Sequence, residues 1–174
     1  MPLFPSAMCL ACWVAPADML GMPLLSMKEL RASLARDQRL IGLDPGSRSI
    51  GVALSDVNLS LASAYGAFRR GKLRDNAAEI IAVAHKEDAG GLVVGLPLAM
   101  DGSLGPTAQS ARDWALALSD ATGLPVALWD ERLTSVAANR FLIEQADVSR
   151  RRRSQAVDRL AATMMLQSAI DSLQ

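Results

Sequence analysis

The stretch RLIGLDPGSRSIGVALSD, from Arg39 to Asp56, decides the fold of the chain. Two apolar runs, RLIGLD (39–44) and SIGVALS (49–55), flank a Pro-Gly turn, and this pattern predicts two strands joined by a tight turn. The first strand ends on a carboxylate, Asp44. An aspartate before Pro-Gly is favourable turn chemistry, so on its own this residue is equally consistent with a turn and with a functional role.

The composition is that of a globular chain. Its 174 residues are 51% apolar and 21% charged, which suits one domain with a substantial core. The charges of the 18 basic and 18 acidic residues cancel, so the formal net charge is zero. This neutral total argues against a protein that coats nucleic acid, but not against a nuclease with an acidic site. No apolar run approaches the roughly 18 to 20 residues of a membrane span, so no membrane partner is expected.

The cysteines indicate no metal or redox site. Both lie in CLAC (9–12), and His85 is the single histidine, so a zinc site would lack its second pair of ligands. We predict two reduced thiols in a cytoplasmic protein.

Residues 1–38 differ from the rest and are interpreted as an N-terminal extension. The first 27 residues contain four of the eight prolines, five of the eight methionines and no lysine or arginine. The prolines interrupt the apolar centre that a secretory signal needs, and we expect poor order up to about residue 27. A helical pattern, KELRASLARDQ, follows Met27, and the domain proper is predicted to span residues 39–174.

Beyond the hairpin, strands and helices alternate. The pattern predicts, in order, a strand at 61–68, a helix at 72–88, a strand at 90–97, a helix at 106–123, a strand at 124–131, a helix at 134–146 and a last helix capped by Ser154. This order predicts an α/β fold with a five-stranded mixed sheet flanked by helices. A three-strand antiparallel meander would be extended by two parallel strands.

Acidic residues fall where such a sheet presents functional groups, at the carboxyl ends of its strands. Asp44 ends the first strand, Asp130 and Glu131 end the last, and Asp158 lies in about the first turn of the final helix. Clustered carboxylates repel one another, and an all-oxygen set without spare histidine or cysteine suits Mg²⁺ or Mn²⁺. Such ions can activate water for phosphodiester hydrolysis. We predict all four acids as catalytic, with Asp44, Glu131 and Asp158 as metal ligands.

Each acid also has a purely structural interpretation. Asp158 on its own is better explained as a first-turn acid that complements the helix dipole. Arg132 could pair with Asp130 or Glu131 in an ordinary surface ion pair. Alternation along the strand sends Asp130 and Glu131 to opposite sides, and the longer reach of Glu131 favours it over its neighbour. The prediction therefore rests on the conjunction of acids from separate elements.

Small residues support the same site. Three glycines keep the hairpin slim, so that a backbone or a phosphate can approach closely: Gly42, Gly46 and Gly51. Gly95 ends the strand expected between the two acid-bearing strands and leaves that gap open. Ala161 and Ala162 share a face of the last helix with Asp158, which would let the helix lie close to the sheet.

Basic residues cluster locally despite the neutral total. RRGKLRD (69–75) is one cluster, and SRRRRS (149–154) is another. An arginine run is equally consistent with a solvated loop and with contact to a phosphate backbone. The residues predicted to bind nucleic acid are Gly46, Arg48, Arg132, Arg150, Arg151, Arg152 and Arg153. The few aromatic residues favour recognition of shape and backbone over base sequence.

Four motifs in order carry a specific resemblance. LDPGSRSIGVALSD (43–56), VVGLPLAMDGSLGPTA (93–108), WDERLTS (129–135) and VDRLAATMMLQ (157–167) closely resemble the YqgF/RuvX family. These are bacterial RNase H-like proteins related to Holliday-junction resolvases and regarded as nucleases of pre-16S ribosomal RNA. The resemblance covers the chain from about Arg39 onward.

The resemblance implies an RNase H-like fold, a cytoplasmic location and divalent-metal phosphodiester hydrolysis, with a role in maturing the 5′ end of 16S rRNA during ribosome biogenesis. Carried over, Asp44 belongs to the first motif, Asp130 and Glu131 to the DER motif, and Asp158 to the last-helix motif. Junction resolvases carry an acid at the end of the fourth strand, where this chain has GLP (95–97). That departure argues against junction cleavage.

The sequence thus predicts a metal-dependent endonuclease, a hydrolase of structured RNA that works as a monomer or homodimer. The alternatives are a Holliday-junction resolvase that cuts branched DNA and a non-catalytic assembly factor that binds rRNA through its arginines. Sugar-kinase-like and actin-like ATPases also carry an Asp-x-Gly hairpin, but they need two such domains and this chain has room for one.

Overall fold

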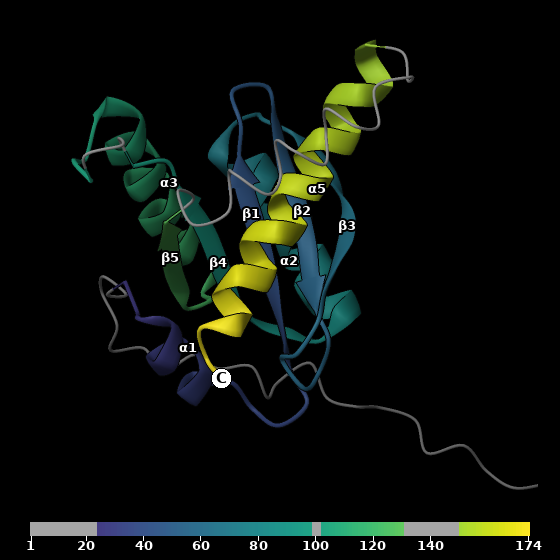
Figure 1. Cartoon of the computed structure of the whole chain (residues 1–174), viewed down its shortest axis with the longest axis vertical. Helices are drawn as coiled ribbons and strands as arrows, with labels where there is room; N and C mark the ends of the chain where they lie inside the picture. Colours follow the sequence, from purple (N-terminus) through teal and green to yellow (C-terminus); the bar gives the residue numbers. More distant parts are fainter. Residues whose placement is uncertain (1–23, 99–101, 131–149) are drawn as a thin grey trace, which may run out of the picture.

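A five-stranded mixed sheet forms the centre of the molecule in the computed structural model (Figure 1). The structure describes residues 24–98, 102–130 and 150–174, and for residues 150–158 it describes the backbone alone. The elements are α1 (Met27–Ser33), β1 (Arg39–Pro45), β2 (Ser49–Ser55), β3 (Ala62–Arg69), α2 (Leu73–Glu87), β4 (Ala89–Leu96), α3 (Pro106–Thr122), β5 (Val126–Asp130) and α5 (Arg150–Asp171). The predicted helix at 134–146 lies outside the described residues.

The strand order is β3-β2-β1-β4-β5. β2 runs antiparallel to both β1 and β3, whereas β4 is parallel to β1 and β5 is parallel to β4. The apolar run of β4 is largely buried, as expected for a parallel strand covered on both faces. In β5, Val126 and Ala127 are buried and the last three residues are partly exposed. The predicted meander with two added parallel strands is therefore confirmed.

The sheet lies between two helical layers. α2 and α3 cover one face, and residues of β1 such as Ile41 and Leu43 are buried against them. α5 crosses β1, β2 and β3 on the other face, together with α1, and there Leu40 is buried (Figure 1). Side chains of a strand alternate between faces, so each position of β1 can be assigned to the α5 face or to the α2/α3 face.

α5 lies very close to β1 because β1 contains Gly42. A Cβ added at Gly42 would lie 2.8 Å from the Cβ of Leu166. Leu166 is itself fully buried. The sequence predicts that Gly42 lets a backbone or a phosphate approach closely, and in the structure it is the helix α5 that lies there. This glycine therefore sets the distance between α5 and the sheet.

The predicted start of the last helix is wrong. α5 already includes Arg150, whereas the sequence places a cap at Ser154. Arginine is a strong helix former, so the arginine run continues the helix instead of forming a loop before it. Asp158 consequently lies eight residues after Arg150 and is not a first-turn acid.

The segment before β1 packs against the sheet. The backbone N–H of Leu25 donates to the carbonyl of Val126 at 2.9 Å. Ser26 then begins α1 with a capping box: its hydroxyl accepts from the N–H of Glu29, and its own N–H donates to the Glu29 carboxylate. Leu30 of α1 is fully buried. The sequence assigns this stretch to the extension, whereas its described part, from Leu24 on, packs against the sheet domain.

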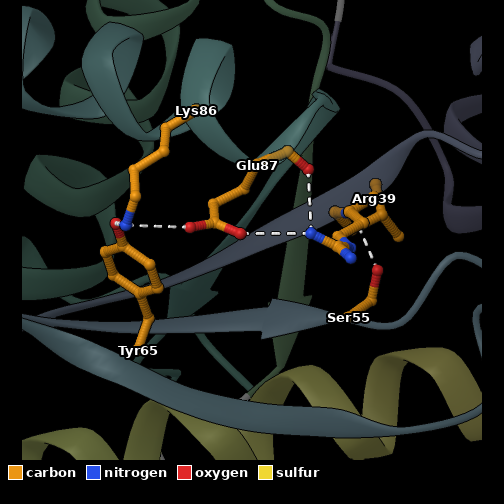
Figure 2. Close-up of polar contacts among 6 residues, drawn as sticks. Arg39, Ser55, Tyr65, Lys86 and Glu87 are labelled. Carbon is orange, nitrogen blue, oxygen red and sulfur yellow. Dashed lines mark hydrogen bonds and ion pairs between the residues drawn. The ribbon is translucent and has the colours of Figure 1, made fainter.

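A polar network closes the end of the sheet where β1 begins (Figure 2). Arg39 donates from Nη1 to the carboxylate and to the carbonyl of Glu87, at 3.1 and 3.2 Å. Lys86 forms a further ion pair with Glu87 at 3.1 Å. Beside it, the buried hydroxyl of Ser55 accepts from the N–H of Leu40 at 2.8 Å. These contacts fix β1 against β2 and α2, at the opposite end of β1 from Asp44.

Candidate active site

Asp44 is a strand residue and not a turn residue. It pairs with Gly51 across the β1–β2 ladder, and the ladder continues to the next pair, Pro45 with Ile50. Because Leu43 faces α2 and α3, alternation places Asp44 on the α5 face. The carboxylate is partly exposed there. Asp44 thus stands at the carboxyl end of β1, beneath the helix that carries Asp158.

A row of positions continues from Asp44 across the sheet. Leu43 pairs with Val94, and Gly95 pairs with Trp129, so Asp44, Gly95 and Trp129 occupy successive strands on the α5 face. Gly95 is buried and places no Cβ between Asp44 and Trp129. That Gly95 leaves the gap between the acid-bearing strands open stays a prediction.

Trp129 is a residue that sequence reasoning missed. Its ring packs at the edge of the core under α5, and its indole Nε1 is buried without a hydrogen-bond partner among the described residues. A buried donor of this kind is costly unless it is paired. The motif WDE contained the residue, but no local pattern distinguished this tryptophan from an ordinary core residue.

Asp130 lies on the other face of the sheet. It pairs with Leu96 at the end of β5, one position beyond Trp129. Since Trp129 belongs to the α5 face, alternation assigns Asp130 to the α2/α3 face. Asp130 and Asp44 therefore lie on opposite faces of the sheet.

The remaining predicted ligands are only partly described. Glu131 lies outside the described residues, and for Asp158 the structure gives its place in α5 but not its side chain. One turn further along the helix, Ala162 is fully buried against the sheet, and Met165 follows on the same side. Among the side chains that are described, no group of three or more His, Cys, Asp or Glu residues is close enough to hold a metal.

Arg70 holds the turn that follows Asp44. Its Nη1 donates to the carbonyl of Pro45 at 3.1 Å and to that of Gly46 at 2.8 Å. Its backbone N–H donates to the carbonyl of Arg48 at 3.0 Å. The arginine cluster 69–75 was visible in the sequence, but nothing in it indicated that one member would reach back to the β1–β2 turn.

The residues predicted to bind nucleic acid fall into three groups. Arg48 is exposed on the β1–β2 turn, and a Cβ at Gly46 would lie 2.9 Å from the carbonyl of Ser49, so the turn requires glycine. Arg132 lies outside the described residues. Arg150, Arg151, Arg152 and Arg153 belong to the first part of α5, with undescribed side chains.

Comparison with known proteins places the chain in a family. The sequence model described as "RuvX: Holliday junction resolvase" matches residues 38–172. The chain belongs to the RuvX family. A RuvX relative from Gluconacetobacter diazotrophicus, named "Putative pre-16S rRNA nuclease", is 62% identical over 151 residues, covering 87% of this chain and 98% of the relative. A second, from Acidiphilium cryptum and with the same name, is 58% identical over 152 residues, covering 87% and 96%.

RuvX membership confirms the resemblance noted in the four motifs. The observed strand order confirms the predicted α/β fold with a five-stranded mixed sheet. Among solved structures, the chain is similar to Thermus thermophilus RuvC in complex with a Holliday junction substrate, with 15% identity and a TM-score of 0.48 over 78% of this chain and 96% of that one. It is also similar to the fowlpox virus Holliday junction resolvase, with 7% identity and a TM-score of 0.47 over 79% and 100%. No helix in the described part is long and apolar enough to cross a membrane.

Proposed function

We propose that this RuvX protein is a metal-dependent endonuclease that hydrolyses phosphodiester bonds of structured RNA and acts in 5′-end maturation of pre-16S rRNA. The observation that carries the proposal is the position of Asp44, a partly exposed residue at the carboxyl end of β1 on the α5 face, with Gly95 at the neighbouring position of β4. Relatives that share about 60% of the sequence over nearly their whole length carry the name of a pre-16S rRNA nuclease.

The donor set suits Mg²⁺ or Mn²⁺. Asp44, Glu131 and Asp158 would hold the ion, because carboxylate oxygens are the ligands that these hard cations prefer. A bound divalent ion would polarise the phosphodiester and lower the pKa of an attacking water. Asp130 lies on the α2/α3 face, and this supports Glu131 rather than Asp130 as the partner of Asp44.

Residues of the chain position the Asp44 carboxylate and the substrate phosphate. Arg70 fixes the turn after Asp44 through the carbonyls of Pro45 and Gly46, so the strand end that bears the carboxylate is held in place. Gly95 adds no side chain between the end of β1 and Trp129 of β5. The exposed Arg48 lies on the β1–β2 turn that follows Asp44, where it can contact a neighbouring phosphate.

The structure favours RNA over a four-way junction. β4 ends at Leu96 with Gly95 on the α5 face, so the described part of this strand brings no carboxylate to the site. A resolvase of the kind considered above would carry an acid there.

The test is direct comparison of two substrates. Purified protein is incubated with a pre-16S rRNA fragment and with a four-way DNA junction, in Mg²⁺ or Mn²⁺ and in EDTA. We expect metal-dependent cleavage of the RNA and little cleavage of the junction. Faster resolution of the junction would favour the resolvase, and RNA binding without cleavage in any metal would favour the non-catalytic assembly factor.

A further inference from the structure

A pocket of about 330 Å³ opens at the carboxyl edge of the sheet, on the side opposite α5. It is lined by Pro45, Arg70, Pro97, Pro106, Thr107, Ser110 and Ala111. Pro45 follows Asp44 directly, so the pocket adjoins the candidate active site along the edge of the sheet. None of the lining residues is acidic.

The positively charged group of the pocket, the Arg70 guanidinium, is held in place by other residues. Arg70 uses Nη1 to bond the carbonyls of Pro45 and Gly46, and its guanidinium carbon lies 5.8 Å from the centroid of the Trp114 ring. A guanidinium has five N–H donors, and Nη1 carries two of them. The other three have no partner among the described residues. Arg70 is therefore pre-organised, with donors to spare for a ligand.

Two hydroxyls complete the lining. Thr107 and Ser110 lie one turn apart on the face of α3 that also carries Trp114, and neither hydroxyl has a hydrogen-bond partner in the part of the chain that the structure describes. The carboxylate of Asp113, nearby on α3, accepts instead from the side chain of Gln109 at 2.8 Å. The pocket thus combines a fixed cation with unpaired hydroxyls and no lining carboxylate.

This combination suits a tetrahedral oxyanion. An arginine fork binds phosphate with two parallel hydrogen bonds, and hydroxyl donors can bind the remaining oxygens. Three prolines line the pocket, and proline offers no backbone N–H and little freedom to close over a ligand. The opening can therefore admit one phosphate of a continuous strand.

We propose that this pocket binds a backbone phosphate of the nucleic-acid substrate, next to the phosphodiester that is cleaved at Asp44. The inference rests on the proposed nuclease function and specifies where the substrate backbone is bound. The strand would cross the edge of the sheet, from Asp44 on the α5 face to Arg70 on the α3 face, and two fixed phosphates would set its register.

The test places a negative charge in the pocket. Ser110→Asp is expected to weaken binding of an RNA oligonucleotide by about tenfold or more, the size of a lost charge-assisted contact, and to raise KM without lowering kcat. Ala78→Asp, at an exposed position of α2, adds the same charge outside the pocket and is expected to leave binding unchanged. Matching thermal unfolding of the two variants shows that both are folded.

Binding is also measured without catalysis. Inorganic phosphate titrated into the wild-type protein is expected to shift the amide resonances of Thr107 and Ser110 saturably, whereas chloride at equal ionic strength does not. If no RNA is cleaved at all, the proposed function fails, but this titration still shows whether the pocket binds phosphate. Absence of the shifts, or unchanged RNA binding by Ser110→Asp, would overturn the proposal that this pocket binds a backbone phosphate. If only oligonucleotides with a 5′-terminal phosphate were sensitive to Ser110→Asp, the assignment to a backbone phosphate would be wrong.

Discussion

Replacement of Gly42 by alanine tests how α5 is seated on the sheet. A Cβ at this position would lie 2.8 Å from Leu166 Cβ and 3.2 Å from its Cδ2. Carbon atoms are most favourably about 3.5 to 4.0 Å apart, so helix and strand must separate by at least about 0.7 Å. Because the nearest atom is a Cβ, no change of the Leu166 rotamer relieves the contact.

The expected cost follows from overpacking. Extra atoms in a packed core destabilise by about 1–3 kcal/mol, and alanine recovers about 0.4–1 kcal/mol by restricting the unfolded chain. We expect Gly42→Ala to lower the free energy of unfolding by about 1–2 kcal/mol. Since α5 carries Asp158, the same separation is expected to reduce RNA cleavage.

The matched control is Gly66→Ala in β3. A Cβ at Gly66 meets nothing within 4 Å, so this variant is expected to be neutral or slightly stabilised. Urea unfolding of both variants, compared at equal m-value, gives the difference in their free energies of unfolding. Equal stability of the two variants would refute the conclusion that Gly42 sets the distance between α5 and the sheet.

Two further predictions concern polar contacts. Ser55→Ala removes the hydroxyl that pairs with the buried N–H of Leu40 and is expected to cost about 1–3 kcal/mol in urea unfolding, with the exposed Ser63→Ala as a near-neutral control. The backbone N–H of Leu61, with help from the adjacent serine, lowers the pKa of Asp56 below its ordinary 3.8. This contribution to stability is present above pH 3.8 and is lost as the pH falls through the lowered pKa, so Asp56→Asn should be less stable than wild type at pH 6 and equal to it at strongly acidic pH. A deficit that stays constant with pH would contradict that assignment.

The hairpin and the parallel strands could be predicted from local pattern. SIGVALS gives β2 at Ser49–Ser55 as predicted, and the helix predicted at 72–88 is observed at Leu73–Glu87. Such elements follow from alternation, helical spacing and turn chemistry, all of which act over a few residues. The prediction that alternation sends Asp130 and Glu131 to opposite sides stays a prediction, because Glu131 lies outside the described residues.

Contacts between distant segments could not be predicted. The partner of Gly42 is Leu166. Ala161 and Ala162 predicted that this helix lies close to the sheet, but no local pattern identified the residue that packs against Gly42. The reach of Arg70 back to the turn after Asp44 is equally a consequence of tertiary packing. The start of α5 was missed for another reason: Ser154 is a good cap residue, but helix-forming arginines before it carry the helix further.

The most direct measurement of the central claim is the rate of Mg²⁺-dependent cleavage of a pre-16S rRNA fragment by Asp44→Asn and by Asp130→Asn, with RNA binding measured in parallel. Asp44 is on the α5 face and Asp130 is on the other, so we expect Asp44→Asn to lose at least about 10²-fold in rate and Asp130→Asn to lose less than about tenfold, both with RNA binding retained. Undiminished cleavage by Asp44→Asn, or an equal loss in Asp130→Asn, would contradict the proposed active site.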